Sequence, residues 1–291
     1  MTGAGGLLGG RLATLLHADG FTVVGGRHAA GLPSGVLETP LDLLDPGSVA
    51  RALEATRAEA VLHSAVLQVD ACEARPAEAK ALNHRATGFL ARACRVGGLR
   101  LVALSTDLVF AGDRRFVSEE DAARPTQVYG RTKLAGEEAA LAAHPDAVVA
   151  RVALVVGRGH GPRGTASEGI AWALRRAGSL RLFADEYRTP VDPESVARAL
   201  ALLLRGNATG RFHLGGPERV SRYELGLRVA RALGLPTHGI EAARQAEHVG
   251  PARPPDVSLD ITRARRELGW APRPLDEVLA EGRAEPGAEP G

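Results

Sequence analysis

The chain has 291 residues, of which 45% are hydrophobic and 24% are charged, as is ordinary for a globular protein with a core. The formal net charge of +2 is too small to mark a nucleic-acid binder, and no apolar run approaches the about 18 residues of a membrane span. The N-terminus shows no secretory leader pattern. Cys72 and Cys94 are too few for a disulfide framework or a zinc site, and the nine His show no metal spacing. The sequence therefore predicts a cytoplasmic protein with no nucleic-acid or membrane partner and no metal.

Hydrophobic periodicity predicts helices and strands that alternate along the chain. A glycine turn over 3–9 leads into a helix, and strands are predicted over 21–25, 60–63, 99–105, 147–156 and 211–214. Further helices are predicted from Asp45-Pro46 onward and over 73–96, 126–143, 166–176, 193–204, 221–233 and 262–268. Because most of these strands are continuous apolar runs, they indicate a parallel sheet covered by helices on both faces.

The predicted fold class is therefore α/β, a Rossmann-type doubly wound parallel sheet with a smaller, discontinuous C-terminal substrate lobe. Residues 1–156 form the predicted dinucleotide-binding domain, to which 191–214 return. Residues 157–190 and 215–280 form the predicted lobe. The Gly-, Pro- and charge-rich residues 281–291 are predicted to be a disordered tail.

Gly3, Gly6 and Gly9 form a glycine pattern at the start of the first predicted helix. Such a turn lets the backbone approach a phosphate and directs free N–H groups at it, although 35 glycines also make chance matches easy. Only Met1 and Thr2 precede the turn, whereas a strand takes about five residues. We expect the first strand to be missing or truncated, interpret this as a mis-assigned or shortened start, and expect reduced stability or weak cofactor binding.

Arg27 follows the second predicted strand, where the residue type distinguishes the two nicotinamide cofactors. An acid at this place would bond a ribose 2′-hydroxyl, whereas a base suits a 2′-phosphate, so Arg27 favours NADP, with NAD as the alternative. In a chain with 34 Arg, a solvated loop arginine is the competing interpretation. Asp42 could reach the adenine or could be a plain turn residue.

Tyr129 and Lys133 form the strongest signal, because the chain has three Tyr and two Lys in all. Residues four apart share one helix face, and a lysine ammonium there is expected to lower the pKa of the phenol and make Tyr129 a proton donor or acceptor. Thr106 ends a predicted strand, at the sheet edge where α/β proteins bind ligands, and its hydroxyl could hold a substrate carbonyl. A plain strand-end turn is the alternative for Thr106.

These motifs give the chain a resemblance to the extended short-chain dehydrogenase/reductase family, and more narrowly to its dTDP-4-dehydrorhamnose reductase-like, sugar-nucleotide-binding branch. The resemblance runs in order through GAGGLLG (3–9), VDACE (69–73), Asn83, LSTDLVF (104–110), VYGRTK (128–133), RTPVD (188–192), FHLGGP (212–217) and RPPDVSLD (253–260). The run from Ser105 to Lys133 is specific to the superfamily, and the later pieces point to the branch.

The resemblance implies a catalytic set of Thr106, Tyr129 and Lys133 in an NAD(P)H-dependent oxidoreductase that reduces the C4 ketone of a nucleotide-linked sugar. Tyr129 would protonate the developing alkoxide, Lys133 would also hold the nicotinamide ribose, and Thr106 would orient the carbonyl. It further implies a nucleotide-sugar or other small carbonyl partner and, as an option, a homodimer. Cofactor contacts are expected at Gly3, Gly6, Leu8, Gly9, Arg27, Asp42, Leu43, Ser64, Ala65, Asn83, Tyr129 and Lys133.

The sequence departs from the family pattern at positions that face the substrate there. Val66-Leu67 replaces a polar Tyr-Thr pair, Leu108 replaces an aromatic residue, and segment 151–155 lacks the expected Trp. These changes put the rhamnose substrate in question more than the reductase chemistry. Two alternatives stay open: an epimerase or dehydratase with tightly held NAD, and a non-catalytic NADP-binding subunit like the β subunit of methionine adenosyltransferase.

Overall fold

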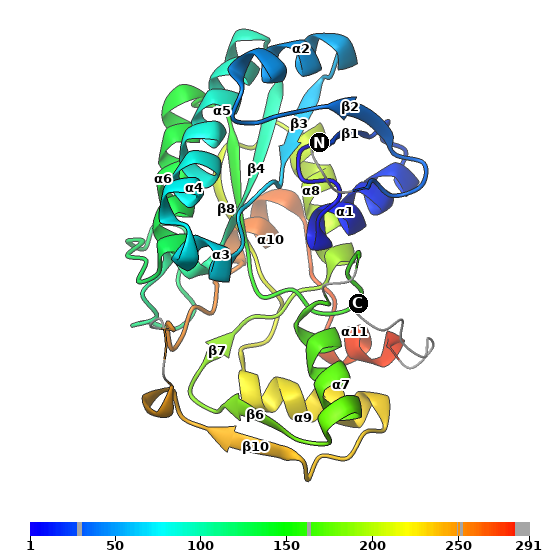
Figure 1. Ribbon diagram of the computed structural model, residues 1–291, viewed down its shortest axis with the longest axis vertical. Helices are drawn as coiled ribbons and strands as arrows, with labels where there is room; N and C mark the ends of the chain where they lie inside the picture. Colours follow the sequence, from blue (N-terminus) through cyan, green and yellow to red (C-terminus); the bar gives the residue numbers. More distant parts are fainter. Residues whose placement is uncertain (28–30, 162–163, 249, 251–252, 283–291) are drawn as a thin grey trace.

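A computed structural model describes residues 1–27, 31–161, 164–248, 250 and 253–282. Its larger domain is built on four parallel strands in the order β3 (Ala60–His63), β4 (Arg100–Thr106), β5 (Val148–Val152) and β8 (Gly210–Leu214). A smaller lobe lies below the carboxyl ends of these strands (Figure 1). The structure confirms the predicted α/β class with a parallel sheet.

Met1 and Thr2 lie where the first strand was expected, between β3 and the next parallel pair. Thr2 forms a parallel bridge with His63, and the Thr2 amide donates to the carbonyl of Leu62 at 3.0 Å. On the other side the Gly26 amide donates to the Met1 carbonyl at 2.8 Å. These two residues therefore join the four-stranded sheet to the parallel pair β1 (Val24–Arg27) and β2 (Leu37–Pro40).

Helices cover both faces of this sheet, because its strands are apolar on both sides. On one face α1 (Leu7–Ala18) packs against α8 (Pro193–Arg205), and on the other α6 (Val128–Ala143) packs against α5 (Thr87–Val96). Helix α2 (Pro46–Thr56) begins as predicted, with Asp45 accepting from the Gly47 amide and proline at the first position. The buried side chains form a separate apolar cluster on each face.

The structure does not form the single helix predicted over 73–96 and divides this segment into four pieces. These are α3 (Val69–Ala74), α4 (Pro76–Ala79), a π-helical segment (Lys80–Ala86) and α5. Pro76 has no amide to donate and cannot sit in a helix interior, so the chain restarts there. The pattern indicated helix correctly, and Pro76 within the predicted range was the signal for the break.

The smaller lobe has an apolar core of its own, formed between α7 (Ala166–Ala177), α9 (Arg222–Leu233) and α11 (Leu275–Glu281). Four short strands complete it: β6 (Leu180–Phe183) pairs parallel with β10 (Ile240–Ala243), and β7 (Tyr187–Arg188) pairs antiparallel with β9 (Val220–Ser221). The sequence predicted α7 and α9 but missed these strands, β2 and α11. Strand β5 also ends earlier than predicted, at Val152.

Two boundaries differ from the sequence-based division. Helix α10 (Thr262–Leu268) packs on β8 and α8, and Trp270 lies in the core of the larger domain, whereas residues 215–280 were assigned to the lobe. Glu281 ends α11 instead of starting a tail, and residues 283–291 lie outside the described part. Short 3₁₀ turns occupy Asp107–Val109 and Gln245–Glu247.

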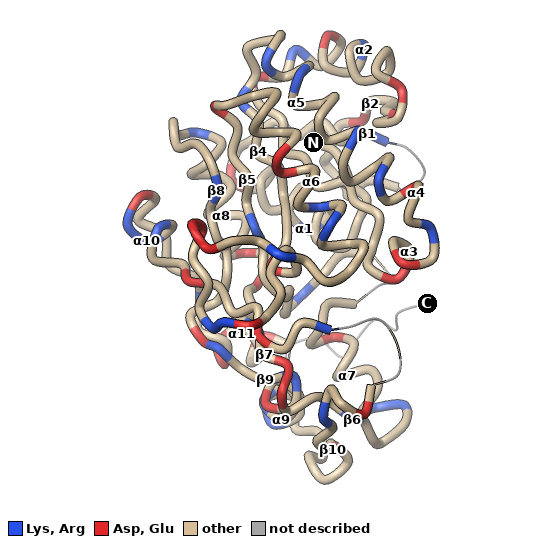
Figure 2. The backbone as a smooth tube through the Cα atoms, turned by 90° about the vertical axis from the view of Figure 1, so that its left-hand side faces the viewer, with Lys and Arg blue, Asp and Glu red and all other residues tan. Residues whose placement is uncertain are grey.

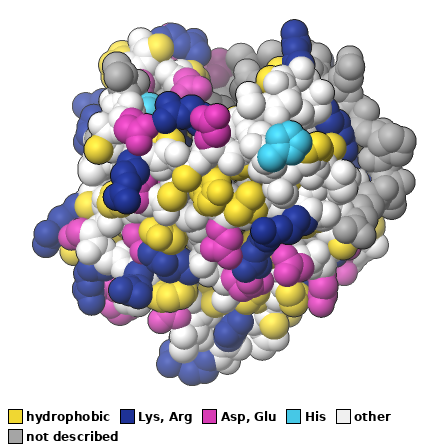
Figure 3. All heavy atoms as spheres, turned by 90° about the horizontal axis from the view of Figure 1, so that it is seen from below, with side chains coloured by type: hydrophobic (Ala, Val, Ile, Leu, Met, Phe, Trp, Pro, Cys, Tyr) yellow, Lys and Arg dark blue, Asp and Glu magenta, His cyan; other side chains and the backbone are white. Residues whose placement is uncertain are grey.

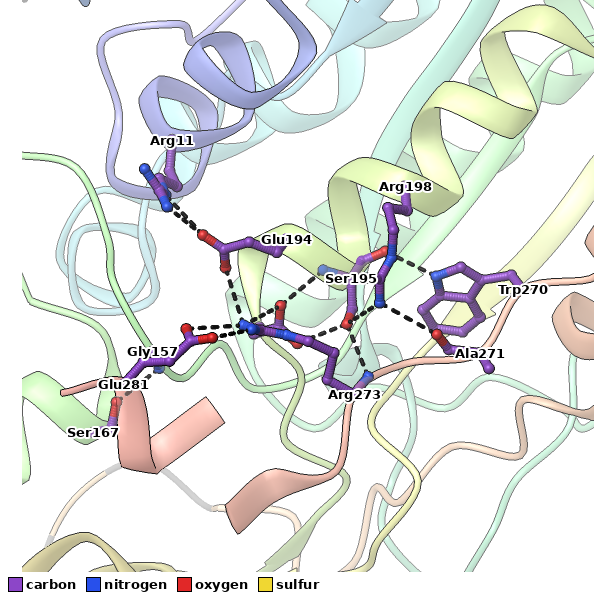
Figure 4. Close-up of polar contacts among 11 residues, drawn as sticks. Arg11, Gly157, Ser167, Glu194, Ser195, Arg198, Trp270, Ala271, Arg273 and Glu281 are labelled. Atoms are coloured by element: carbon purple, nitrogen blue, oxygen red, sulfur yellow. Dashed lines mark hydrogen bonds and ion pairs between the residues drawn. The ribbon is translucent and has the colours of Figure 1, made fainter. Parts of the chain in front are cut away.

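A network of charged side chains connects the two parts of the molecule (Figure 4). Arg273, just before α11, pairs with Glu281, with Glu194 at 3.6 Å and with Asp192 at 3.1 Å. Glu194 also binds Arg11 of α1. Asp192 caps α8 by accepting from the Ser195 amide at 2.8 Å. The network therefore joins the first helix, α8 and the lobe.

Charged residues of both signs are interspersed along the chain (Figure 2) and on the face seen from below (Figure 3). This distribution agrees with the small net charge. In the described ranges, no helix is both long and apolar enough to cross a membrane, and no cluster of metal-ligating side chains occurs.

Candidate active site

A cleft of about 1300 Å³ lies between the carboxyl edge of the sheet and the lobe. This exceeds the about 300–1,000 Å³ of a typical small-molecule pocket, so the cleft has room for more than one ligand. Most of the residues predicted from the sequence line it: Gly3, Gly6, Leu8, Gly9, Asp42, Leu43, Ser64, Ala65, Thr106, Tyr129 and Lys133. Arg27 and Asn83 are absent from its lining.

The glycine turn lies where the sheet order reverses, between Met1-Thr2 and β3. Gly3 has a φ of +66°, and a Cβ there would lie 2.6 Å from the Ala65 amide nitrogen. A Cβ on Gly9 would lie 2.1 Å from the Gly3 carbonyl oxygen, so α1 can begin against the turn only without a side chain. This cradle at a helix N-terminus at the switch point of the sheet fits the diphosphate of a dinucleotide.

Two polar residues near this turn are already engaged within the protein. The Ser64 hydroxyl donates to the Thr2 carbonyl at 2.7 Å and so secures Thr2 beside β3. Asp42 accepts from the Leu44 amide at 2.8 Å, which is the arrangement of an ordinary turn. Both side chains still line the cleft.

Arg27 and Asn83 lie outside the cleft for different reasons. Arg27 is half exposed at the end of β1, and its Nε lies 2.8 Å from a carboxylate oxygen of Glu38. Asn83 is buried in the π-helical segment, where its Oδ1 accepts from the Leu67 amide at 2.8 Å and its Nδ2 donates to Thr132 at 3.2 Å. Asn83 therefore supports the cleft wall at Leu67 from behind instead of reaching into the cleft.

Thr106, Tyr129 and Lys133 all line the cleft. Thr106 ends β4, and its Oγ1 accepts from the Leu108 amide at 3.2 Å and donates to Asp107 at 3.1 Å. Tyr129 lies in the first turn of α6 and shares a hydrogen bond with Thr106. One turn later, Lys133 donates from Nζ to the Leu104 carbonyl at 2.7 Å. A hydroxyl, a phenol and an ammonium are thus gathered at one strand end.

Burial dominates the protonation of this group. It raises the pKa of Tyr129 above its ordinary value, with the Asp107 charge adding to the effect and the hydrogen bond to Thr106 opposing it. This direction is opposite to the one expected from a lysine one turn away. Burial also lowers the pKa of Lys133 to about 8, against the attraction of Glu137. Tyr129 is therefore a neutral phenol at pH 7 that holds its proton.

A charged group that sequence reasoning did not single out faces these residues from the lobe. Glu186, Arg188, Arg222 and Arg253 line the cleft together with Asp107. The Arg253 Nε binds Glu186 at 2.6 Å, and the Arg188 Nε lies 3.8 Å from Asp107. Burial raises the pKa of Asp107 to about 6. Arg188 and Arg253 belong to the segments that carried the family resemblance, which is the signal that could have identified them.

The departures from the family pattern form an apolar part of the cleft wall. Val66, Leu67, Leu108 and Leu154 all line it. Because none of these side chains offers a hydrogen bond, recognition of a polar ligand here depends on the charged group of the lobe and on backbone atoms.

The chain matches the family model described as the RmlD substrate binding domain over residues 1–285. It is 32% identical to a probable low-salt glycan biosynthesis reductase, Agl14, of Haloferax volcanii, covering 96% of this chain and 95% of that protein. It is also 32% identical to the dTDP-4-dehydrorhamnose reductase of Mycolicibacterium smegmatis, with coverages of 94% and 80%. The β subunit of methionine adenosyltransferase 2 from Rattus norvegicus is 28% identical, with coverages of 90% and 80%.

Solved structures agree with these relatives. The crystal structure of a hypothetical dTDP-4-dehydrorhamnose reductase from Sulfolobus tokodaii is 29% identical and superposes with a TM-score of 0.82, covering 92% of this chain and 94% of that one. MoeE5, solved with UDP-glucose and NAD, is also 29% identical, with a TM-score of 0.81 and coverages of 96% and 95%. The chain therefore belongs to the RmlD substrate binding domain family, within the extended short-chain dehydrogenase/reductase branch.

Proposed function

We propose that the protein is an NAD(P)H-dependent reductase of a nucleotide-linked 4-keto sugar. The observation that carries the proposal is the placement of the glycine cradle and of Thr106, Tyr129 and Lys133 along one cleft. Family membership supports it, because two relatives at 32% identity are named as reductases. The cleft volume supports a site that holds a dinucleotide and a second ligand together.

The side chains of the cleft divide the work on the substrate carbonyl. A bound nicotinamide supplies the hydride. Thr106 turns its one hydroxyl proton from Asp107 to the carbonyl oxygen and so orients the carbonyl. Tyr129, which holds its proton at neutral pH, transfers that proton to the oxygen as it becomes an alkoxide. Lys133 supplies a positive charge that stabilises the phenolate left behind.

The cradle residues would hold the cofactor, with Gly3, Gly6 and Gly9 at the diphosphate and Leu8, Asp42, Leu43, Ser64 and Ala65 along its length. NADP is favoured by Arg27, whose guanidinium lies at the end of β1 and could exchange its exposed partner Glu38 for a 2′-phosphate. NAD is the alternative, and MoeE5 was solved with it. Asn83 acts in this proposal through the wall it supports.

The substrate is a nucleotide sugar in this proposal, because the lobe brings Arg188, Arg222 and Arg253 to the same cleft as Thr106. Their charges suit an anionic diphosphate. The apolar wall formed by Val66, Leu67 and Leu154 favours a sugar with few hydroxyls at that side, such as a deoxysugar. The proposal places the protein in the cytoplasm and allows a homodimer, which sedimentation analysis measures.

Tyr129→Phe is the direct test, with NADPH oxidation followed against a panel of nucleotide 4-keto sugars. We expect Tyr129→Phe to bind NADPH but to lose about 100-fold or more in kcat. Tyr223→Phe, which changes a lobe tyrosine of α9, is the matched control and should keep full activity. Wild-type turnover that survives Tyr129→Phe would contradict the proposal.

A regulatory, non-catalytic subunit is the second candidate, favoured by the 28% identity to the methionine adenosyltransferase β subunit. It predicts that NADPH binds without turnover of any keto sugar and that the chain changes the activity of a partner enzyme. An epimerase or dehydratase would instead convert a nucleotide sugar without net NADPH consumption, which product analysis in the same assay detects.

A further inference from the structure

The carboxylate of Glu137 is buried next to the proposed site, where it has almost no contact with solvent. Glu137 lies on α6 one turn after Lys133 and is only 3% exposed. Charged side chains are almost never fully buried unless they are paired. Three groups from three strands bind this carboxylate, so the fold devotes one residue from each of β4, β5 and β8 to it.

The first partner is Ser105, which precedes Thr106 at the end of β4. The Ser105 hydroxyl donates to the Glu137 carboxylate at 2.5 Å, and Lys133 donates to the Leu104 carbonyl at 2.7 Å. One face of α6 is thereby attached to two consecutive residues of β4, directly before Thr106. Because Tyr129 lies on α6 and Thr106 on β4, these two bonds fix the position of one relative to the other.

Glycines let α6 come close enough for these bonds. A Cβ on Gly130 would lie 2.2 Å from the Leu108 carbonyl oxygen, and a Cβ on Gly136 would lie 2.2 Å from the Asn83 carbonyl oxygen. The helix is therefore seated tightly at both ends of the Tyr129–Glu137 stretch.

The other partners are arginines. Arg151 of β5, 2% exposed, binds Glu137 through two nitrogens, Nε at 3.0 Å and Nη2 at 2.8 Å, and Arg211 of β8 approaches it at 3.3 Å. Burial lowers the pKa of Lys133, and the Glu137 charge is the largest effect that raises it. Cys72 of α3 raises this pKa as well. His63 of β3 faces Lys133 as well, and burial keeps its imidazole neutral.

We propose that Glu137 is a positioning residue of the reductase site: it holds α6 against the end of β4 through Ser105 and Arg151, and it supplies the negative charge that keeps Lys133 cationic. The catalytic role of Lys133 in this inference rests on the proposed function. The contacts and charges around Glu137 are independent of the proposed function.

Stability alone gives no reason for a buried ion pair at this place. Removing charges from water is costly, and apolar side chains of similar volume often replace buried pairs without loss of stability. A carboxylate is needed here only if its charge is used. Besides Arg151 and Arg211, Lys133 lies one turn away on the same helix and feels that charge.

The test uses the scarcity of lysine, since Lys80 and Lys133 are the only two in the chain. Protein labelled with ¹³C at the lysine Cε gives two side-chain signals, which Lys80→Arg assigns. The Lys133 signal is expected to titrate with a midpoint of about 8. In Glu137→Gln, which keeps the size of the side chain, we expect that midpoint to fall by about one pH unit or more.

Glu138→Gln is the matched control, because Glu138 is the exposed neighbour of Glu137 on the same helix. It should leave both lysine midpoints unchanged. The proposal is overturned if the Lys133 midpoint in Glu137→Gln stays at the wild-type value. If Glu137→Gln does not fold, the double variant Glu137→Leu, Arg151→Leu replaces the pair by apolar side chains. A smaller fall of the Lys133 midpoint is expected there, because the Arg151 cation is removed together with the carboxylate.

Ser105→Ala separates attachment from charge. It removes one hydrogen bond but keeps the carboxylate, so we expect an unchanged Lys133 midpoint and a several-fold lower kcat with an unchanged KM. Glu137→Gln should in addition move the pH–kcat profile to lower pH, whereas an unmoved profile contradicts the proposal. The titration needs neither cofactor nor substrate, so it tests the role of Glu137 even if the reductase assay finds no turnover. Absence of turnover argues against the proposed function and not against the role of Glu137.

Discussion

Gly9→Ala should weaken cofactor binding, because the new methyl group would overlap the backbone of the glycine turn. The new Cβ would lie 2.1 Å from the Gly3 carbonyl oxygen and 2.7 Å from the Ser64 hydroxyl, whereas ordinary contact begins at 3.4 Å. The turn must therefore move by more than 1 Å. The atom nearest to the new Cβ is a backbone oxygen, which cannot rotate away as a side chain does. Overpacking of this kind costs about 1–3 kcal/mol. Expressed as lost affinity, this is about 5- to 150-fold in the Kd for NADPH.

Fluorescence titration of NADPH measures this loss, and a thermal melt shows whether the fold is also weakened. Gly169→Ala is the matched control, because it lies within α7 and a Cβ there meets nothing within 4 Å. Removing a glycine from a helix interior should stabilise the protein by about 0.5–1 kcal/mol and leave NADPH binding unchanged. Wild-type affinity in Gly9→Ala would refute the assignment of this turn to the diphosphate.

Three further predictions concern the site. Lys133→Arg should lower kcat by about 100-fold or more, because a guanidinium differs from an ammonium in shape and hydration; full activity would remove Lys133 from the mechanism. Arg27→Ala should raise the Kd for NADPH about tenfold or more and leave that for NADH unchanged, and equal changes in both titrations would show that Arg27 does not contact the 2′-phosphate. Asp107→Asn should raise the thermal midpoint at pH 7.5 but not at pH 4. Burial raises the pKa of Asp107 to about 6, so the folded protein binds more protons than the unfolded chain between about pH 4 and 6, and stability is lost as pH rises through that window. The gain at pH 7.5 is at most about 3 kcal/mol, and a lower midpoint would contradict the argument.

The sequence alone was sufficient for the fold class, and most of the site residues that it singled out line the cleft. Local signals carried that information: apolar runs of strand length, a proline after Asp45, and a glycine spacing at a helix start. These signals depend on backbone conformation and burial, which neighbouring residues largely decide. The rarity of lysine and tyrosine singled out Tyr129 and Lys133 as site residues. Their separation by one helical turn is fixed by α-helix geometry.

Long-range packing decided the rest. The spacing of Tyr129 and Lys133 could not show that burial outweighs the lysine charge at the phenol. Asn83 lies behind the cleft wall because the π-helical segment turns its amide toward Leu67. Arg188 pairs with Asp107, and Arg253 pairs with Glu186. The partners of each pair are far apart in sequence, so only the folded chain brings them together. Protonation and charge pairing depend on the surroundings in three dimensions, and the tertiary structure alone supplies those surroundings.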